Sequence, residues 1–325
     1  MTSAHCHTCG TAVIRDAVFC EACGARVEPV SPDAAVVTGC HVCGAAAEAV
    51  GLDGYCTICG AREAATRDRI ELNLGAAAVV SDRGLVHTRN EDAFHLDADV
   101  SGVAAVVCDG VTVSPSADLA ARRAAEAAGL ALAEALRDGA SASADAIPAA
   151  AAAARRAVEG LDGAPTGDLA GPACTLVAGL CRHGEVSVGW LGDSRAYWLS
   201  EDEAVQLTED DSWAGEQVLA GRLSEAQAAA DPRARSITRW IGSDAPAEPP
   251  RIVSLRPSSE GLLVLCSDGL SIALPRVTDV ARLVRQLPES ASPLAVARSL
   301  ADFAVAAGGQ DNITVVVVHV QSDGR

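Results

Sequence analysis

The sequence predicts an α+β fold in which two sheets pack face to face with helices on the outside. Two observations predict it: apolar runs of strand length come in groups after residue 70, and long alanine-rich helical stretches stand between those groups. Each sheet and helix has an apolar side, so alternating groups bury these sides by stacking as layers. A third observation sets the N-terminus apart, because its first 60 residues carry paired cysteines in place of apolar runs. We expect a small N-terminal module over 1–62, a linker over 63–70 and the main domain over 71–322.

The individual elements follow from the local pattern. Continuous apolar runs bounded by turn residues predict buried strands. They cover residues 72–82, 94–96, 103–109, 174–181, 185–191, 195–199, 252–255, 261–266 and 312–320. Alanine-rich stretches predict long helices over 116–138 and 142–159, the first of them with Pro115 in its first turn. Further helices are expected over 278–287 and 292–307. The polar, irregular residues 209–235 predict a flap with short helical pieces.

Acidic residues stand where several of these strands begin or end. Asp109 and Asp268 each follow an apolar run and precede a glycine, whereas Asp311 and the pair Glu91 and Asp92 stand just before a strand. If these strands pair antiparallel, two strand ends and two strand starts meet at one edge. Four or five carboxylates at one edge repel strongly unless cations lie among them. The pattern therefore predicts a metal site, although a single Asp-Gly is also common in turns.

Eight of the twelve cysteines form four C-x-x-C pairs in the first 59 residues, arranged as two similar halves. Two such pairs supply the four thiolates of a closed tetrahedral zinc site. A module of about 20 residues depends on its metal to fold. We therefore expect two structural Zn²⁺ ions, with redox-active pairs or iron–sulfur clusters as weaker alternatives. The expected ligands are Cys6, Cys9, Cys20, Cys23, Cys40, Cys43, Cys56 and Cys59.

Composition and charge argue against several classes of function. The formal net charge is −18, and every one of the 25 Lys and Arg positions holds arginine. Nucleic acids and anionic membranes attract basic surfaces, so this charge disfavours both as partners. No apolar run reaches the ~18 residues of a membrane span, and the N-terminus lacks the pattern of a signal peptide. The four remaining cysteines lie singly in or beside apolar runs, as in a reducing compartment, so a soluble cytoplasmic protein is expected.

The ordered series SDRG…NED, VVCDG, GDSRAY, LTEDDS, ITRWIG, CSDGL and GGQDNITV resembles the metal-dependent protein phosphatases of type 2C (the PPM family) over residues 72–320. GDSRAY and GGQDNIT are the most specific of these motifs. The resemblance implies an αββα sandwich of two antiparallel sheets flanked by helices, with a two-metal site in the cleft between the sheets. The cysteine-rich segment resembles a double zinc ribbon, a module that docks proteins or nucleic acids; its low positive charge favours protein docking.

Carried over position by position, the resemblance implies ligands for two hard cations. Asp109 would bridge the two ions, and Gly110 would add its carbonyl oxygen. The other ligands would be Asp268 and Asp311 for one ion, and Glu91 and Asp92 for the other, partly through water. Oxygen ligands of this kind select Mg²⁺ or Mn²⁺. Two such ions would activate a water for in-line attack on phosphorus, so no protein nucleophile is required.

Several positions depart from the family pattern. Asp193, in GDSR, corresponds to a ligand of a third, weaker metal ion, but Ile272 stands where the family has a second acid, so a third ion stays open. His87 stands in place of the phosphate-binding arginine, and Arg89 is the preferred substitute, with Arg83 as the other candidate. His87 could instead donate a proton to the leaving group.

These residues predict a Mg²⁺- or Mn²⁺-dependent phosphatase that hydrolyses phosphoserine and phosphothreonine in proteins. Its catalytic residues would be Asp109, Asp268, Asp311, Arg89 and His87. The zinc ribbons would serve docking or regulation, and the partners would be substrates of a Ser/Thr kinase. The alternative is a weakly active or inactive phosphatase-like module that binds phosphoproteins. Two features favour this alternative: His87 replaces the arginine of the family, and residues 111–114 replace a glycine-rich loop. A nucleic-acid adaptor conflicts with the charge.

Overall fold

The computed structural model describes residues 4–5, 12–13, 43, 45, 57–59, 67–138, 143–161, 171–246 and 248–321. The chain divides into two compact units, Met1–Arg67 and Asp68–Arg325. In the first unit, β1 (Ala4–His5) and β2 (Ala12–Val13) form an antiparallel pair. Six of the eight predicted zinc ligands lie outside the described residues. The other two, Cys43 and Cys59, are exposed.

The second unit contains two antiparallel sheets. The larger consists of β3 (Arg69–Asn73), β4 (Ala77–Asp82), β10 (Arg195–Ser200), β11 (Ala204–Gln206), β14 (Gly261–Cys266) and β15 (Ile313–Val320). The smaller consists of β5 (Ala93–Asp99), β6 (Gly102–Cys108), β8 (Leu176–Arg182), β9 (Glu185–Leu191) and β13 (Arg251–Leu255). Their strand orders are β11-β10-β14-β15-β4-β3 and β13-β9-β8-β6-β5, and β7 (Ala173–Cys174) pairs with β12 (Ile241–Gly242).

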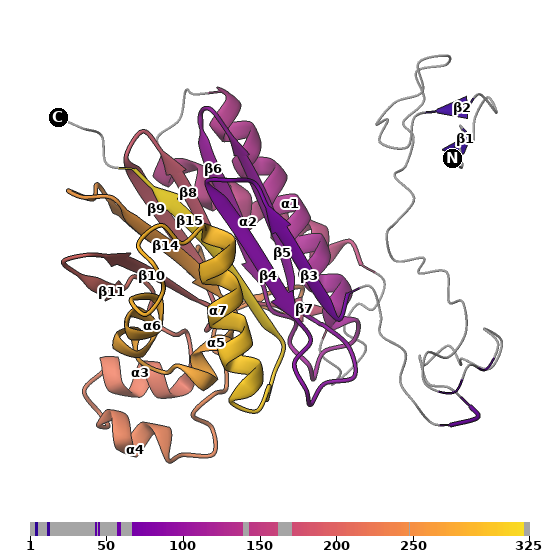
Figure 1. Cartoon of the computed structure of the whole chain (residues 1–325). Helices are drawn as coiled ribbons and strands as arrows, with labels where there is room; N and C mark the ends of the chain where they lie inside the picture. The colour runs from indigo at the N-terminus through magenta and orange to yellow at the C-terminus, as the bar shows by residue number, and fades with distance from the viewer. Residues whose placement is uncertain are drawn as a thin grey trace. The chain divides into compact units, whose positions relative to one another are not determined.

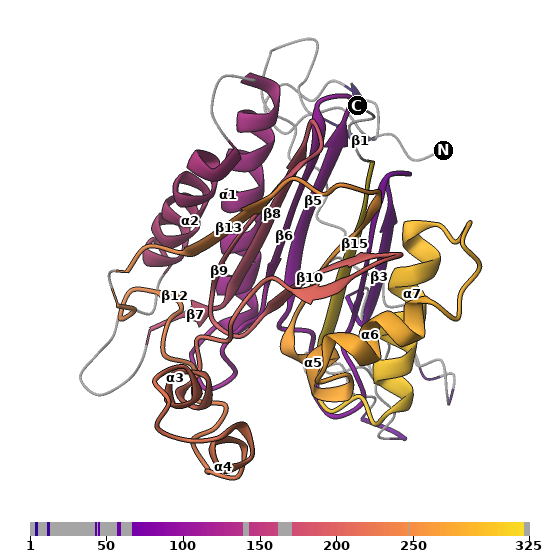
Figure 2. The ribbon, with the colours of Figure 1, turned by 90° about the vertical axis from the view of Figure 1, so that its left-hand side faces the viewer.

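Helices cover the outer face of each sheet (Figure 1). The helices α1 (Ala117–Asp138) and α2 (Ser143–Glu159) lie on the smaller sheet. On the larger sheet lie α5 (Asp268–Ala273), α6 (Val277–Val284) and α7 (Pro293–Ala306). Figure 2 shows the four layers edge-on, and side chains such as Val107, Val188 and Leu263 fill the space between the sheets without solvent exposure. The expected layers of helix, sheet, sheet and helix are present.

Strand register brings the acidic positions of each sheet side by side. In the smaller sheet Ala93 pairs with Cys108, so the residues before β5 lie beside those after β6. In the larger sheet Cys266 pairs with Val315, so the end of β14 lies beside the start of β15. All strand pairs concerned are antiparallel, as the metal-site prediction required.

Three local features differ from the sequence expectation or complete it. The single strand expected over 72–82 is a hairpin of β3 and β4, because Gly75 turns the chain at φ 80° and donates its N–H to Asn73 Oδ1 at 3.0 Å. The first long helix begins at Ala117, after Pro115, because Ser116 has a φ of 53°, which no α-helix accepts. No helix among the described residues has the length and apolarity to cross a membrane.

Candidate metal centre

Carboxylates from both sheets gather at one edge of the sandwich. Burial raises the pKa of Asp109 well above its ordinary value, and the negative charges of Asp92, Asp268, Asp193 and Asp311 raise it further. Burial also raises the pKa of Asp92 to about 7, that of Asp193 to about 7 and that of Asp268 to about 6. The structure therefore brings five of the predicted acidic ligands close enough for their charges to interact.

The loop after β6 is fixed by Thr175, a residue that sequence reasoning did not single out. The Asp109 N–H donates to Thr175 Oγ1 at 3.0 Å, and the Thr175 N–H donates to the Asp109 carbonyl at 2.8 Å. Thr175 Oγ1 also lies 2.8 Å from Ser194 Oγ, next to Asp193. A Cβ on Gly110 would lie 2.7 Å from the Ala117 carbonyl oxygen, so only glycine allows α1 to start so close to the predicted bridging residue.

Asn312 holds the segment that carries Glu91. Its Oδ1 accepts the Glu91 N–H at 2.7 Å. Its Nδ2 donates to the carbonyl oxygens of Arg83 at 2.7 Å and of Arg89 at 3.1 Å. Asn312 thus ties the loop before β5 to the loop before β15. The sequence signal was its place in the motif QDN, but the motif does not show which distant loop it contacts.

Ser267 plays the matching role at the end of β14, and it too was missed. Its Oγ donates to Asp92 Oδ2 at 2.7 Å and accepts the Thr314 N–H at 2.9 Å. Because this serine is fully buried, the hydrogen bonds fix the Asp92 carboxylate with little freedom. Its position in CSDG, one residue before Asp268, was the available signal.

The donor set fits a hard divalent cation. Asp268 Oδ1 and Glu91 Oε2 are buried and accept no hydrogen bond from the described residues. A buried carboxylate oxygen without a donor is costly unless a cation binds it. All of these donors are oxygens, which suits Mg²⁺ or Mn²⁺. No three His, Cys, Asp or Glu side chains within the described part of the chain already converge on one point, so ion binding would draw these carboxylates together.

Arg89 and Arg83, the two candidate phosphate-binding arginines, differ in their surroundings. Arg89 Nε lies 3.5 Å from Glu91 Oε1 and its Nη1 lies 3.7 Å from Asp118 Oδ1, while 65% of the side chain is exposed. Arg83 Nε lies 3.3 Å from Asp68 Oδ1, and its Nη1 donates to a backbone carbonyl. The Arg89 side chain is therefore beside the cluster and largely exposed, whereas the Arg83 guanidinium is held by Asp68 and by the His87 carbonyl.

His87 reaches the cluster from the same loop. Its Nε2 lies 3.2 Å from Asp311 Oδ1. The loop packs directly on the segment before β15: Gly84 has a φ of 72°, and a Cβ there would lie 2.2 Å from the Asp311 carbonyl oxygen. The Leu85 N–H donates to the Gly309 carbonyl at 2.8 Å. The structure thus places both predicted catalytic side chains, His87 and Arg89, beside predicted metal ligands.

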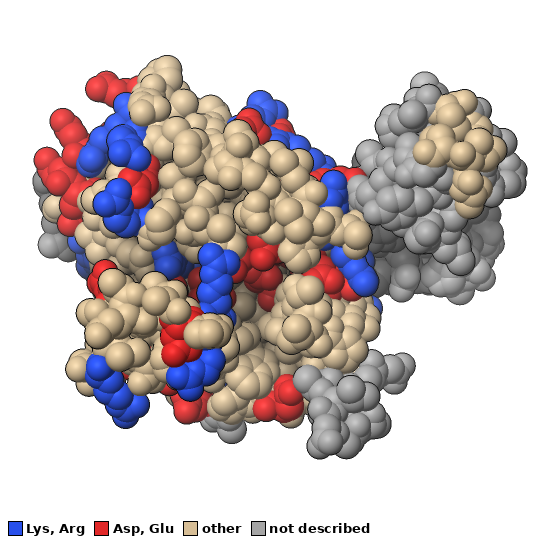
Figure 3. Space-filling model, turned by 90° about the horizontal axis from the view of Figure 1, so that it is seen from below, with Lys and Arg blue, Asp and Glu red and all other residues tan. Residues whose placement is uncertain are grey.

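A pocket of about 630 Å³ opens beside the cluster. Asp193, Asp268 and Ile272 line one side of it, and the flap helices α3 (Trp213–Leu219) and α4 (Glu225–Ala229) line the other. Figure 3 views the molecule from below Figure 1, where these helices lie, and shows acidic side chains in a hollow with basic side chains at its margin. Ile272 adds no ligand, so Asp193 stands there without the second acid of the family.

Several known proteins are similar to this chain in sequence. Residues 85–304 match the family model described as protein phosphatase 2C. The serine/threonine phosphatase stp of Listeria welshimeri is 30% identical over 153 residues, which are 46% of this chain and 58% of that protein. The serine/threonine protein phosphatase PstP of Mycobacterium tuberculosis is 32% identical over 154 residues, 47% of this chain and 28% of that protein. The chain therefore spans less than two thirds of the length of either relative.

Solved structures agree with the family match. The crystal structure of the Mycobacterium tuberculosis serine/threonine phosphatase PstP/Ppp has a TM-score of 0.62 and 29% identity, and covers 78% of this chain and 100% of that one. A structure of the PstP catalytic domain in complex with two manganese ions has a TM-score of 0.54 and 28% identity, over 75% of this chain and 98% of that one. The fold of this domain is that of these solved phosphatase domains. Because the family model matches more than half of its length, the chain belongs to the protein phosphatase 2C family.

Proposed function

We propose that this protein is a Mg²⁺- or Mn²⁺-dependent phosphatase that hydrolyses phosphoserine and phosphothreonine in proteins. The observation that supports the proposal is that Asp109, Asp268 and Asp311 lie at one edge, close enough for their negative charges to interact, so that bound cations would relieve their mutual repulsion. Membership of the protein phosphatase 2C family supports it, since relatives such as stp and PstP are named serine/threonine phosphatases.

The proposed ligand set follows the sequence prediction. The residues that would hold two ions are Glu91, Asp92, Asp109, the carbonyl of Gly110, Asp268 and Asp311. Asp193 would take part in a third, weaker site. Bound divalent cations supply an activated water for attack on phosphorus and offset the charge of the phosphoryl oxygens. Ser267 and Asn312 orient the carboxylates and their loops before any ion arrives, which lowers the cost of forming the site.

The phosphoryl group would be bound by Arg89, whose guanidinium is exposed beside Glu91. A planar guanidinium can donate two parallel hydrogen bonds to a phosphate. His87 Nε2 would contact the phosphoryl group or pass a proton to the oxygen of the leaving serine or threonine. The pocket beside the flap would receive the peptide on either side of the phosphorylated residue.

The N-terminal unit is proposed to carry two structural Zn²⁺ ions in a double ribbon, through the eight cysteines of the four C-x-x-C pairs. The proposal rests on the spacing of these cysteines alone. The ribbons would dock partner proteins or regulate the phosphatase, because the acidic chain disfavours nucleic acid. Phosphoproteins made by a Ser/Thr kinase would be the substrates.

The second candidate is a weakly active or inactive module that binds phosphoproteins. Two observations favour it: a histidine occupies the family's arginine position, and residues 111–114 form a pinned loop. In that loop the Val111 N–H donates to the Ala173 carbonyl at 3.0 Å, and the Ser114 N–H donates to the Val111 carbonyl at 2.7 Å. A loop held in this way adapts less readily to a substrate than a glycine-rich one.

One experiment separates the two candidates. Phosphate release from a phosphothreonine peptide is measured with the full chain and Mn²⁺, then with a chelator, then with Mn²⁺ restored. The phosphatase proposal expects release that the chelator abolishes and the metal recovers. A folded protein that binds the peptide without releasing phosphate would instead establish the binding module.

A further inference from the structure

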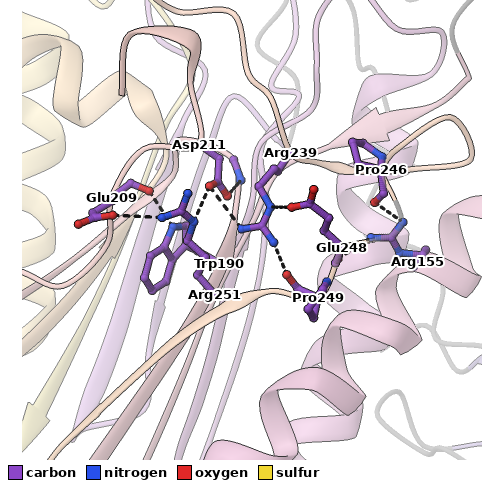
Figure 4. Close-up of polar contacts among 10 residues, drawn as sticks. Arg155, Trp190, Glu209, Asp211, Arg239, Pro246, Glu248, Pro249 and Arg251 are labelled. Atoms are coloured by element: carbon purple, nitrogen blue, oxygen red, sulfur yellow. Dashed lines mark hydrogen bonds and ion pairs between the residues drawn. The ribbon is translucent and has the colours of Figure 1, made fainter. Parts of the chain in front are cut away.

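Asp211 is a buried acid outside the carboxylate cluster, at the start of the flap (residues 209–235). None of its side chain is exposed. Its Oδ1 lies 2.9 Å from Arg251 Nε and 3.5 Å from Arg239 Nη1, and its Oδ2 accepts the Gly192 N–H at 3.2 Å (Figure 4). A buried carboxylate between two guanidinium groups depends on both partners, because removing either side leaves an uncompensated charge.

The backbone around Asp211 joins the two ends of the flap. The Asp211 N–H donates to the Gly192 carbonyl at 2.9 Å, and the Thr238 N–H donates to the Asp211 carbonyl at 2.8 Å. The Trp213 N–H donates to the Ser236 carbonyl at 2.8 Å. Asp211 therefore joins the first residues of the flap to the segment that follows it and to the turn between β9 and β10.

Gly192 connects this point to the carboxylate cluster. It directly precedes Asp193 and has a φ of 107°, and a Cβ there would lie 2.7 Å from Thr175 Cγ2. Thr175 in turn accepts the Asp109 N–H at 3.0 Å. Gly192 therefore adjoins the proposed metal ligand Asp193 and lies against Thr175, which bonds to the proposed ligand Asp109.

The outer part of the same network runs away from the cluster. Arg239 Nε pairs with Glu248 Oε2 at 2.9 Å. Arg155, on α2, donates to the carbonyl oxygens of Pro246 at 3.1 Å and of Glu248 at 3.3 Å. These contacts hold the backbone of Pro246 and of Glu248 on α2 and do not involve Gly192. A substitution of Arg155 therefore serves as a matched control for a substitution of Asp211 in the same network (Figure 4).

We propose that Asp211 is a positioning residue that fixes the flap and the Gly192–Asp193 turn relative to each other, and so sets both metal affinity and KM for a phosphopeptide. The inference rests on the proposed phosphatase function, because it assigns the role to the flap side of that same site. The pocket of about 630 Å³ has the flap helices on one side and Asp193 and Asp268 on the other, so a peptide in it contacts both parts that Asp211 joins.

The substitution Asp211→Asn tests the role with the least change of shape. Asparagine keeps an oxygen that can accept the Gly192 N–H, but it removes the charge that Arg239 and Arg251 share. Both guanidinium groups then lose their buried partner, and the hold on the turn weakens. The expected loss of Mn²⁺ and peptide affinity is about tenfold, which is the effect of weakening one hydrogen bond that involves a charged group.

The experiment compares the full-length wild type, Asp211→Asn and Arg155→Ala. Mn²⁺ binding is measured by calorimetry, and kcat and KM are measured with a phosphothreonine peptide and with a small aryl phosphate. For Asp211→Asn we expect the Mn²⁺ Kd and the peptide KM to rise about tenfold, and the KM for the aryl phosphate to rise less, because the small substrate does not reach the flap. Arg155→Ala is expected to match the wild type within about twofold.

Three results would overturn the inference: unchanged Mn²⁺ and peptide binding in Asp211→Asn, a loss of kcat alone, or equal losses in Asp211→Asn and Arg155→Ala. The last would mean that the network only stabilises the fold. If Asp211→Asn does not fold, the variant Arg251→Lys, which keeps the positive charge beside Asp211, is used in its place. The Mn²⁺ Kd and the peptide KM are again expected to rise. If the wild type shows no turnover, the phosphatase proposal fails, while the Mn²⁺ Kd of the variants still decides the role of Asp211.

Discussion

His87 Nε2 lies 3.2 Å from Asp311 Oδ1, so the side chain at the family's arginine position contacts a proposed metal ligand. A guanidinium would offer two parallel donors to a phosphate, whereas an imidazole offers one from this nitrogen. The contact also directs the partly exposed ring toward the cluster. Under the proposed function we therefore expect phosphate binding to depend on Arg89 more than the family pattern implies.

His87→Arg should lower KM for a phosphothreonine peptide about three- to tenfold, because it restores a bidentate donor beside Asp311. Steady-state kinetics at saturating Mn²⁺ measure the change. His319→Arg adds the same charge on β15 at the far end of the strand and should leave KM unaltered. An unchanged or higher KM in His87→Arg would show that the histidine is required as it stands.

Asp268→Asn should reduce phosphate release more than about a hundredfold, since it removes a ligand from the metal centre. The metal-free variant should nevertheless melt at a higher temperature than the metal-free wild type, because mutual repulsion of the carboxylates falls. Activity and thermal unfolding with a chelator are the two measurements. Asp302→Asn serves as the control and should change both measurements little, because this largely exposed side chain on α7 pairs with Arg69 at the surface. A less stable metal-free Asp268→Asn would show that repulsion among the carboxylates does not govern the stability of the metal-free domain.

The metal-free domain should lose stability as the pH rises from about 5 to about 8. In the folded state the pKa of Asp268 is about 6 and those of Asp92 and Asp193 are about 7, all above the ordinary value of an aspartate. The folded state therefore binds more protons than the unfolded chain. This contribution is complete below the ordinary pKa and disappears as the pH passes through the raised values. Unfolding curves with a chelator test it, and a flat or rising profile would refute it; excess Mn²⁺ should remove the decline.

Thr175→Val should destabilise the domain by about 1–3 kcal/mol, because the Asp109 N–H and Ser194 lose their buried partner at little change in volume. The affinity for Mn²⁺ should fall as well, since Thr175 holds the backbone of the proposed ligand Asp109 and the side chain of Ser194, which follows the proposed ligand Asp193. Denaturant unfolding and calorimetry measure the two effects. Thr175→Ser keeps the hydroxyl and should retain most of the stability and most of the Mn²⁺ affinity. If the serine variant loses as much as the valine variant, the methyl group and not the hydroxyl is responsible.

The full chain should contain two zinc ions after purification, measured by mass spectrometry of the metal content. Cys6→Ser should release one of them and Cys40→Ser the other, because each ribbon needs all four thiolates. The Mn²⁺-dependent activity on an aryl phosphate should survive both changes. Full zinc content in either variant would count against the ribbon assignment.

Much of the fold was predictable because its strands are buried on both faces. Such strands read as continuous apolar runs, as in residues 103–108 and 261–266, and acids that interrupt these runs at strand ends stand out. The hairpin of β3 and β4 was missed because its turn at Gly75 is short and the apolar pattern runs through it. The start of α1 was placed one residue early, because the left-handed φ of Ser116 has no sequence signal.

The supporting residues of the site were less accessible to sequence reasoning. Asn312 bonds to Glu91 across 221 positions, and Ser267 bonds to Asp92 across 175. A serine or asparagine beside a motif gives no indication of a partner at that distance. Asp211 lies in the polar stretch that the sequence predicted as a flap, and the sequence does not show that it contacts Arg239, Arg251 and Gly192, because these residues meet only in the folded chain.

The central claim is that acids from both sheets bind two divalent ions at one edge. Anomalous diffraction at the manganese absorption edge, from crystals of the full chain grown with Mn²⁺, tests it most directly. The account predicts two peaks within ligand distance of the carboxylates of Asp109, Asp268 and Asp311. Crystals with no peak at this edge, or with manganese bound only elsewhere on the chain, would contradict it.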